Sequence, residues 1–436
     1  MKITIHRGSR EIGGSCVEIS DDKIRIVVDI GMPLVDSNNE RFDFKKYKHL
    51  KGHELIDEGV LPDIKGFYAW DKNNSPVDAL LISHAHIDHY GLIRFVRKDI
   101  PCYLGDGTKR LIDLSNIFAG GGNYIYKEKL FKNMKQFQIG NFRITPFLMD
   151  HIAFDSYAFL IENNGKKIVY SGDFREHGRK PMALNRFLNS VPRGIDALML
   201  EGSLFGRDGK PKTEQEVEHD IIAEIKDSSS PVLAMPSGQN IDRIVSFYKA
   251  AIKTKRLFVI DVYIANILDA LKDLAKIPHP SKSFSNIKVF YPYHLSDKLA
   301  KRGKRDLLTK FRKFRISREE LAKKINKTLM IVRTSMLSDL VRMKDIEGST
   351  LIYSMSRIYL KNDSMKEFTD FIKNKKMRMV YAHTSGHAPV ETLKKVVAAI
   401  KPKKVIPIHT FKPEMYAEAF KDADVMEVPD RWSIEV

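Results

Sequence analysis

The spacing of hydrophobic and polar positions divides the chain into two kinds of segment, and the change comes near residue 207. Before it, glycine-containing turns separate short apolar runs, as at residues 3–6, 16–19 and 24–29, and this pattern predicts antiparallel strands. After it, helix-length segments alternate with short apolar runs, as at residues 213–260, which is the βαβ pattern of a parallel sheet. The sequence therefore predicts an α/β protein with two structural units.

The end of the chain combines a strand at residues 378–381, a helix at residues 390–400 and a strand that begins near residue 404. No repeat and no low-complexity linker separates the units, so we expect the second to be inserted into the first. The predicted domains are a first part at residues 1–206, an inserted domain at residues 207–378 and a return segment at residues 379–436.

The amino-acid composition limits the possible cellular compartment and the possible binding partners. The two cysteines, Cys16 and Cys102, lie far apart, and no apolar run approaches the ~18 residues that cross a membrane. The first residues already alternate like a strand, with no apolar signal region, so we expect a cytoplasmic protein with no membrane partner. Lysine and arginine total 73 against 55 aspartate and glutamate, and the formal charge of +18 favours a polyanionic partner.

A basic stretch at residues 298–318 carries Phe311 and Phe314 among its lysines and arginines. It has two interpretations. One is the solvated face of helices, and the other is a surface for the phosphate backbone of a nucleic acid, with the rings stacking on bases.

The most informative segment is residues 77–91. An apolar run predicts a buried strand that ends at Ser83-His84, a helix-compatible run follows at residues 92–98, and the turn between them carries His84, His86, Asp88 and His89. Imidazole and carboxylate are ligands that Zn²⁺, Mn²⁺ and Fe accept, so this turn predicts half of a two-metal site.

The remaining ligands follow later apolar runs, because Asp173 comes directly after such a run and His151 and His409 stand near others. We expect one ion to be held by His84, His86 and His151, the other by Asp88, His89 and a late histidine such as His409, with Asp173 between them. Two dications about 3.5–4 Å apart lower the pKa of a shared water and clamp a phosphate or carbonyl oxygen. The expected nucleophile is therefore a hydroxide between two metals.

A hydrolase must also protonate its leaving group, and His387, in a Ser-Gly-His turn before a predicted helix, is a candidate proton donor. Glu201 could orient it and raise its pKa. Ser385 has two interpretations, as a ligand of phosphate oxygens or as a cap of the helix. Asp29, at the end of an apolar run, either caps a turn or supports a functional group.

These residues resemble a known family. The segment His84-Ala-His86-Ile-Asp88-His89 is similar to the signature of the metallo-β-lactamase fold, and Asp29, His151 and Asp173 resemble its other motifs. Glu201, the turn from His383 to His387 and the segment Pro407-Ile-His409 resemble the three further motifs of the β-CASP nucleases, most closely those of the ribonuclease J type.

The resemblance implies a metallo-β-lactamase αββα sandwich with an inserted β-CASP cap, two Zn²⁺ ions, with Mn²⁺ as the alternative, and hydrolysis of RNA as an exo- or endonuclease. His409 stands where DNA-directed members carry valine, which favours RNA. The expected partner is single-stranded RNA. The implied catalytic residues are Asp88, Asp173, His387 and Glu201, with His383, Ser385 and His387 holding the scissile phosphate and Asp29 supporting a ligand. Ribonuclease J has a further C-terminal domain that supports oligomers, and this sequence stops soon after His409, so an oligomer stays an open alternative that no C-terminal domain supports.

Three alternatives stay open. The same site could cut DNA, or hydrolyse a small molecule as a lactonase or thioesterase does, or the chain could be a non-catalytic subunit that binds RNA. The size of the cap and the basic stretch argue against a small-molecule enzyme.

Overall fold

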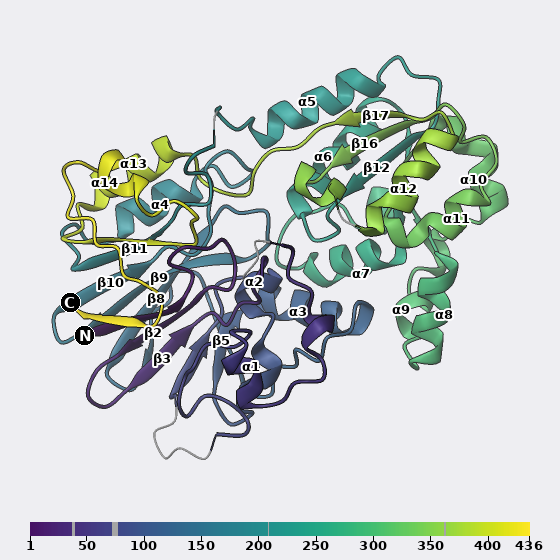
Figure 1. Cartoon of the computed structure of the whole chain (residues 1–436). Helices are drawn as coiled ribbons and strands as arrows, with labels where there is room; N and C mark the ends of the chain where they lie inside the picture. The colour runs from purple at the N-terminus through teal and green to yellow at the C-terminus, as the bar shows by residue number, and fades with distance from the viewer. Residues whose placement is uncertain (37–39, 72–76, 208, 362) are drawn as a thin grey trace.

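Two stacked sheets build one lobe of the molecule and a third sheet builds the other (Figure 1). The two lobes lie side by side, and the chain termini lie together at the far end of the first lobe. The computed structural model describes residues 1–36, 40–71, 77–207, 209–361 and 363–436.

The first sheet has the order β19-β1-β2-β3-β4-β5-β6, antiparallel from β19 to β3 and parallel from β3 to β6. Its strands are β1 (Lys2–Arg7), β2 (Cys16–Ser20), β3 (Arg25–Val28), β4 (Ala79–Leu81), β5 (Cys102–Gly105), β6 (Glu128–Phe131) and β19 (Trp432–Glu435).

The second sheet has the order β18-β11-β10-β9-β8-β7. Its strands are β7 (Phe137–Ile139), β8 (Phe142–Met149), β9 (Ser156–Asn163), β10 (Lys166–Tyr170), β11 (Ala197–Glu201) and β18 (Val405–Ile408). Apolar side chains of both sheets, among them Ile5 and Val28 from the first and Phe159 and Met199 from the second, share one core. The sheets therefore pack face to face, as alternating inward residues dictate.

Helices cover the outer faces of this sandwich. Side chains of α4 (Ala183–Ser190), α13 (Val390–Ile400) and α14 (Met415–Ala419) pack on the second sheet, and those of α1 (His53–Asp57), α2 (Ile87–Tyr90) and α3 (Asp106–Phe118) pack on the first. The layers are thus helix, sheet, sheet and helix, which confirms the predicted αββα architecture.

The third sheet is parallel throughout, with the order β14-β13-β15-β12-β16-β17. Its strands are β12 (Val232–Pro236), β13 (Leu257–Asp261), β14 (Ile287–Phe290), β15 (Thr328–Ile331), β16 (Thr350–Ser354) and β17 (Arg378–Tyr381). Its helices are α5 (Glu214–Ile225), α6 (Ile241–Lys253), α7 (Val262–Leu271), α8 (Tyr293–Lys301), α9 (Asp306–Thr309), α10 (Arg318–Lys324), α11 (Leu337–Val341) and α12 (Asp363–Asn374). The mixed α/β cap expected from the sequence is therefore present.

Short 3₁₀ turns complete the described elements, namely η1 (Phe44–Tyr47), η2 (Ile93–Phe95), η3 (Lys282–Phe284), η4 (Arg312–Phe314), η5 (Ile325–Lys327), η6 (Thr334–Met336) and η7 (Arg357–Lys361). No helix in the described ranges has the length and apolar character needed to cross a membrane.

Three predictions differ from the structure. The helix expected at residues 92–98 is wrong, because the helical turn α2 begins earlier, at Ile87, and Val96 is already extended. Burial of Ile93 and Val96 in the core sets this path, so tertiary packing overrides the local pattern. Strand β17 pairs with β16 in the third sheet up to Tyr381, so the cap sheet continues past the predicted boundary at residue 378.

The third difference concerns the basic stretch. Phe311 is only 2 % exposed and belongs to the hydrophobic core, and Phe314 packs against that core, so their rings do not form the base-stacking surface that was one interpretation. Several cations of the stretch have partners of their own. Lys298 donates to the carbonyl of Phe118, and Lys310 and Arg318 pair with Asp269 and Asp339.

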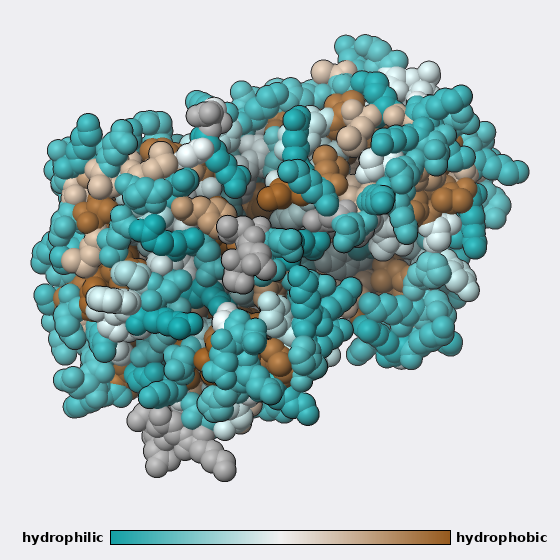
Figure 2. All heavy atoms as spheres, in the orientation of Figure 1, coloured by the Kyte–Doolittle hydropathy of each residue, from teal (hydrophilic) through white to brown (hydrophobic). Residues whose placement is uncertain are grey.

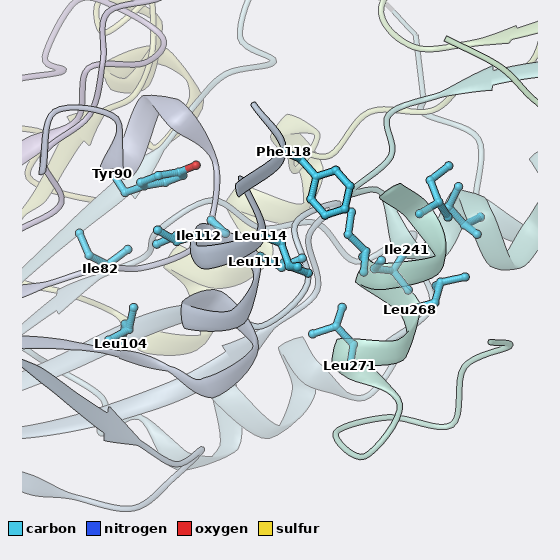
Figure 3. Packing of buried hydrophobic residues seen from close by; sticks show 14 of the residues in the cluster. Ile82, Tyr90, Leu104, Leu111, Ile112, Leu114, Phe118, Ile241, Leu268 and Leu271 are labelled. Carbon is cyan, nitrogen blue, oxygen red and sulfur yellow. The ribbon is translucent and has the colours of Figure 1, made fainter. Parts of the chain in front are cut away.

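One core joins the two lobes (Figure 3). Leu111 and Phe118 of α3 lie against Leu268 and Leu271 of α7, and the ring of Phe118 is 5.0 Å from that of Tyr263. Because buried apolar surface drives association, this contact fixes the cap on the sandwich.

Candidate metal centre and active site

The histidine-rich turn lies where β4 ends. His84 is fully buried three residues after the strand, and His86 is extended and serves as the N-cap of α2, so Asp88 and His89 follow in the first helical turn. A strand end followed by a helical turn therefore presents both histidines and both helix residues around one point. Gly31 makes this possible, because a Cβ there would lie 1.8 Å from the backbone oxygen of Asp88.

The structure brings the predicted ligands together in two groups that share Asp173. In each group one ligand atom per residue lies within 4.8 Å of all the others. The first group is His84, His86, His151 and Asp173, and the second is Asp88, His89, Asp173 and His409.

Distances around Asp173 suit metal ligands. Its Oδ2 lies 3.1 Å from Nε2 of His89, 3.5 Å from Nε2 of His409 and 3.7 Å from Nε2 of His84. A tetrahedral ion with bonds of about 2.0–2.2 Å holds its ligand atoms about 3.3–3.6 Å apart.

Three buried atoms in these groups have no hydrogen-bond partner, namely Nε2 of His84, Oδ1 of Asp173 and Nε2 of His409. Leaving such atoms unpaired costs free energy, which a bound cation would recover. The donor set therefore fits the two divalent ions that the sequence predicts.

Asp29 orients one candidate ligand. Its Oδ2 accepts hydrogen bonds from the hydroxyls of Ser83 and Tyr170, at 2.7 and 2.9 Å, and lies 2.8 Å from Nδ1 of His89. Holding Nδ1–H in this way turns Nε2 of His89 toward Asp173, as partners of metal-bound histidine do. Asp29 was expected either to cap a turn or to support a functional group, and its contacts with His89 favour the second interpretation.

Two other imidazoles are held in the same manner. Nδ1 of His151 donates to the carbonyl of Gly386 at 2.6 Å, and Nδ1 of His409 lies 2.9 Å from the hydroxyl of Ser15. Each contact leaves Nε2 facing the centre. The second is made from the glycine-containing turn after β1, so both ends of the chain reach the site.

Burial tunes most of these histidines toward the neutral form that binds metal. It lowers the pKa of His84 and His151 well below the usual value and that of His86 to about 4. His89 is the exception, because burial lowers its pKa but the charges of Asp173 and Asp29 raise it well above the usual value. An imidazole poised between two carboxylates would exchange its proton for a metal ion.

His387 and Glu201 form a pair beside the two groups. Nδ1 of His387 lies 3.3 Å from Oε1 of Glu201 and 3.9 Å from Oδ2 of Asp173. Burial lowers the pKa of His387, but the charges of Glu201 and Asp173 outweigh it and raise the pKa to about 9. His387 is therefore protonated at neutral pH, as a proton donor must be.

The turn before His387 is held by its own hydroxyl, because Oγ of Ser385 accepts a hydrogen bond from the backbone N–H of His387 at 3.1 Å. Ser385 therefore does not cap the helix as one interpretation had it, since the N-cap of α13 is Pro389, and its hydroxyl instead stabilises the turn before the helix. His383 lies outside both ligand groups, with Nδ1 3.4 Å from the carbonyl of Ser354, and burial lowers its pKa to about 4.

Sequence reasoning missed two residues that anchor this turn. The carbonyl of Ser385 accepts hydrogen bonds from Nη1 of Arg175 at 3.1 Å and from Nε2 of His177 at 2.9 Å. Both follow Asp173 closely, so the segment that carries the shared ligand also anchors the turn that carries His387. Position after Asp173 was the one available signal.

Comparisons with known proteins agree with this arrangement. Models of a beta-lactamase superfamily domain and of the metallo-beta-lactamase superfamily match residues 66–225 and 10–111, and a model of a Zn-dependent metallo-hydrolase RNA specificity domain matches residues 374–424. A protein of unknown function from Enterococcus faecalis V583 has the same fold, with a TM-score of 0.78, 21% identity and 99% of each chain covered. Residues 10–225 and 374–424 are thus similar to domains of the metallo-β-lactamase type.

Curated proteins that match this chain indicate a more specific family. Ribonuclease J of Helicobacter pylori is 24% identical over 94% of this chain and 56% of its own, and an RNase J-like protein of Methanocaldococcus jannaschii is 26% identical over 60% of this chain and 57% of its own. The predicted resemblance to ribonuclease J-like β-CASP proteins is thereby confirmed. The chain spans about half the length of the curated relatives it matches.

Proposed function

We propose that this chain is a metal-dependent ribonuclease that hydrolyses phosphodiester bonds in single-stranded RNA. One observation carries the proposal: two groups of metal-ligand side chains share Asp173 and adjoin the His387–Glu201 pair. Such an arrangement joins a site for divalent ions, which can activate the attacking water, to a proton donor for the leaving oxygen.

Two zinc or manganese ions, when bound, would polarise the phosphate and lower the pKa of the attacking water. The chain's own residues then have separate tasks. His387 gives its proton to the leaving oxygen, and Glu201 holds the imidazole in place. The carboxylate of Glu201 also accepts hydrogen bonds from the backbone N–H groups of Ser203, Phe174 and Ala388. These contacts keep the carboxylate fixed through the proton transfer.

The segment from His383 to His387 would hold the scissile phosphate. Its turn is anchored through the carbonyl of Ser385, which leaves the side chain of His387 free to face Asp173. The positive charge of His387 would attract a phosphate oxygen before it supplies the proton.

RNA is favoured over DNA by two observations. The RNA specificity domain model matches the segment that carries His383, His387 and His409, and the relatives named above are ribonucleases or ribonuclease-like proteins. The formal charge of +18 suits either polyanion. RNA is therefore the substrate that these observations support best.

A comparison of labelled single-stranded RNA and DNA of one sequence, with zinc or manganese supplied, tests the proposal. We expect faster cleavage of RNA, and label at the 5′ or 3′ end separates exonuclease from endonuclease products. Equal or faster cleavage of DNA would assign a DNA nuclease. Tight RNA binding with no cleavage by the metal-loaded protein would assign a binding subunit.

A further inference from the structure

Tyr381 is an exposed aromatic residue at the end of β17, the edge strand of the cap sheet (Figure 1). Its side chain is 40% exposed. Tyr353, its cross-strand neighbour, is buried, and the two rings are stacked with centroids 6.4 Å apart and planes at 23°. A buried ring therefore supports the exposed one from below.

Arg357 adds a cation to this ring. Its guanidinium carbon lies 4.4 Å from the ring centroid of Tyr381, and the residue is exposed at the start of η7. Within the described ranges no carboxylate forms an ion pair with Arg357. The face of the molecule drawn in Figure 2 is mostly hydrophilic.

This pair adjoins the candidate active site. The ring of Tyr381 is 6.0 Å from that of His383, from which the chain continues to His387. The four residues from His383 to His387 span at most about 14 Å even when fully extended. The ring of Tyr381 therefore lies only a few nucleotides of substrate away from the phosphate at His387. On the other side, Tyr359 of η7 is near enough to Asp88 for that charge, after burial, to raise the pKa of the phenol.

We propose that Tyr381 and Arg357 form a stacking site for an unpaired nucleobase of the substrate strand, next to the scissile phosphate. The inference rests on the proposed function and adds to it the group that is bound. Because Tyr353 lies on one side of the ring of Tyr381 and Arg357 on the other, the base would stack on the planar guanidinium, which the ring holds in place. The guanidinium also supplies charge for the adjoining phosphate.

The same pair explains a preference for single strands, because a base within a duplex is stacked on its neighbours and cannot stack on a protein side chain. It also replaces the basic stretch at residues 298–318 as the stacking surface for bases, since Phe311 there is buried. The site is sequence-tolerant, because every base has a flat face.

The test uses the metal-loaded enzyme, a fluorescein-labelled single-stranded oligoadenylate with hydrolysis-resistant phosphorothioate linkages, and a second probe whose central residues are abasic. Loss of one stacked base weakens binding by about 5- to 100-fold, so we expect Tyr381→Leu to lose that much affinity for oligoadenylate and Tyr381→Phe to keep it. We expect Arg357→Gln to weaken binding too. The abasic probe should bind the native protein and Tyr381→Leu equally.

The matched control is Trp432→Leu, which removes a ring that is 66% exposed on β19, an edge strand of the first sheet in the other lobe, and should leave binding unchanged. Equal binding of oligoadenylate by the native protein and Tyr381→Leu would overturn the inference. The inference would also be overturned if the native protein were a dimer and Tyr381→Leu a monomer. That result would mean that β17 binds a second copy of the chain and not a nucleobase. Failure of the native enzyme to cleave unmodified RNA would instead count against the proposed function.

Discussion

Nη2 of Arg175 lies 2.7 Å from Oδ2 of Asp242, and this ion pair joins the two lobes beside the candidate metal centre. The guanidinium is fully buried, and it also lies 3.5 Å from Asp150 of the sandwich and 3.6 Å from Glu214 of the cap. Because the same group donates to the carbonyl of Ser385, one arginine connects cap, sandwich and the turn that carries His387.

We expect Arg175→Met to lose about 3–5 kcal/mol of unfolding free energy, because breaking a buried pair leaves the partner carboxylates uncompensated. Activity should fall as well, since the turn at Ser385 loses a donor. Urea unfolding and the turnover number on labelled RNA check the two effects.

Arg110→Met is the matched control for this variant. Arg110 also joins the lobes, through Asp273 and the carbonyl of Ala270, but its side chain is 31% exposed and that of Asp273 is 58% exposed. Water and salt screen such a pair, so its loss should be much smaller than that of Arg175. If the two variants lost the same unfolding free energy, burial of Arg175 would not be the reason for its contribution.

A second prediction concerns acid stability. Burial raises the pKa of Glu214, but Arg243, which donates to it at 2.7 Å, and Arg175 lower it from 4.5 to about 2. A depressed pKa stabilises the fold above the unfolded value of 4.5, and this contribution of about 3 kcal/mol is lost as the pH falls from 4.5 toward 2. We expect the unfolding free energy of Glu214→Gln to depend less steeply on pH below 4.5 than that of the native protein.

Urea unfolding at several pH values between 3 and 6 provides that comparison. The expected difference in slope is at most about 1.4 kcal/mol per pH unit, the value for one proton. Parallel curves for the two proteins would mean that Glu214 keeps an ordinary pKa in the folded state.

A third prediction tests the metal ligands. His86→Ala removes one imidazole from the first group, so the zinc content should fall from two ions per chain toward one and RNA cleavage should be abolished. RNA binding should be largely kept, because the charge of the surface is unchanged. Metal analysis and anisotropy on the same sample measure both.

His219→Ala provides the control, since His219 is exposed on α5, and we expect it to keep both zinc and activity. Full cleavage by His86→Ala would remove His86 from the reaction. Two zinc ions in that variant would place the first ion elsewhere.

A fourth prediction concerns the proton donor. We expect His387→Ala to lower the turnover number by about 10²- to 10⁴-fold on RNA, the usual loss of a general acid. With a pKa of about 9, His387 is protonated below that pH and loses its proton above it, so native activity should decline on the alkaline side. Bound cations favour the neutral imidazole and move this decline to lower pH.

The pH profile distinguishes this role from a structural one. The alkaline decline assigned to His387 should be absent in His387→Ala, and a substrate with a nitrophenolate leaving group, which needs no proton, should be cleaved almost as fast by the variant. An unchanged alkaline decline would assign it to another group.

The candidate ligands were predictable because their chemistry is visible in single residues. Histidine and aspartate at the ends of apolar runs stand out, and the structure brings His84, Asp173 and His409 together although they are far apart in the chain. The alternation of helices and strands likewise predicted the parallel sheet of the cap.

Arg175, His177 and Tyr381 were beyond such reasoning for a physical reason. The sequence does not distinguish a buried arginine from an exposed one, and the chain has 73 lysines and arginines in all. Only the fold shows which guanidinium lies in the core. Exposure of Tyr381 depends on its strand being at the edge of the sheet, and strand order is set by pairings between distant segments. Local patterns carry neither kind of information.

The pairing of β1 with β19 sets the order in which the protein can be completed during synthesis. Lys2 lies opposite Glu435, so the outer edge of β1 stays uncovered until β19 has been synthesised. The second ligand group waits in the same way for His409. Until β19 and His409 have both been synthesised, a nascent chain therefore holds an uncovered strand edge and an incomplete set of candidate metal ligands.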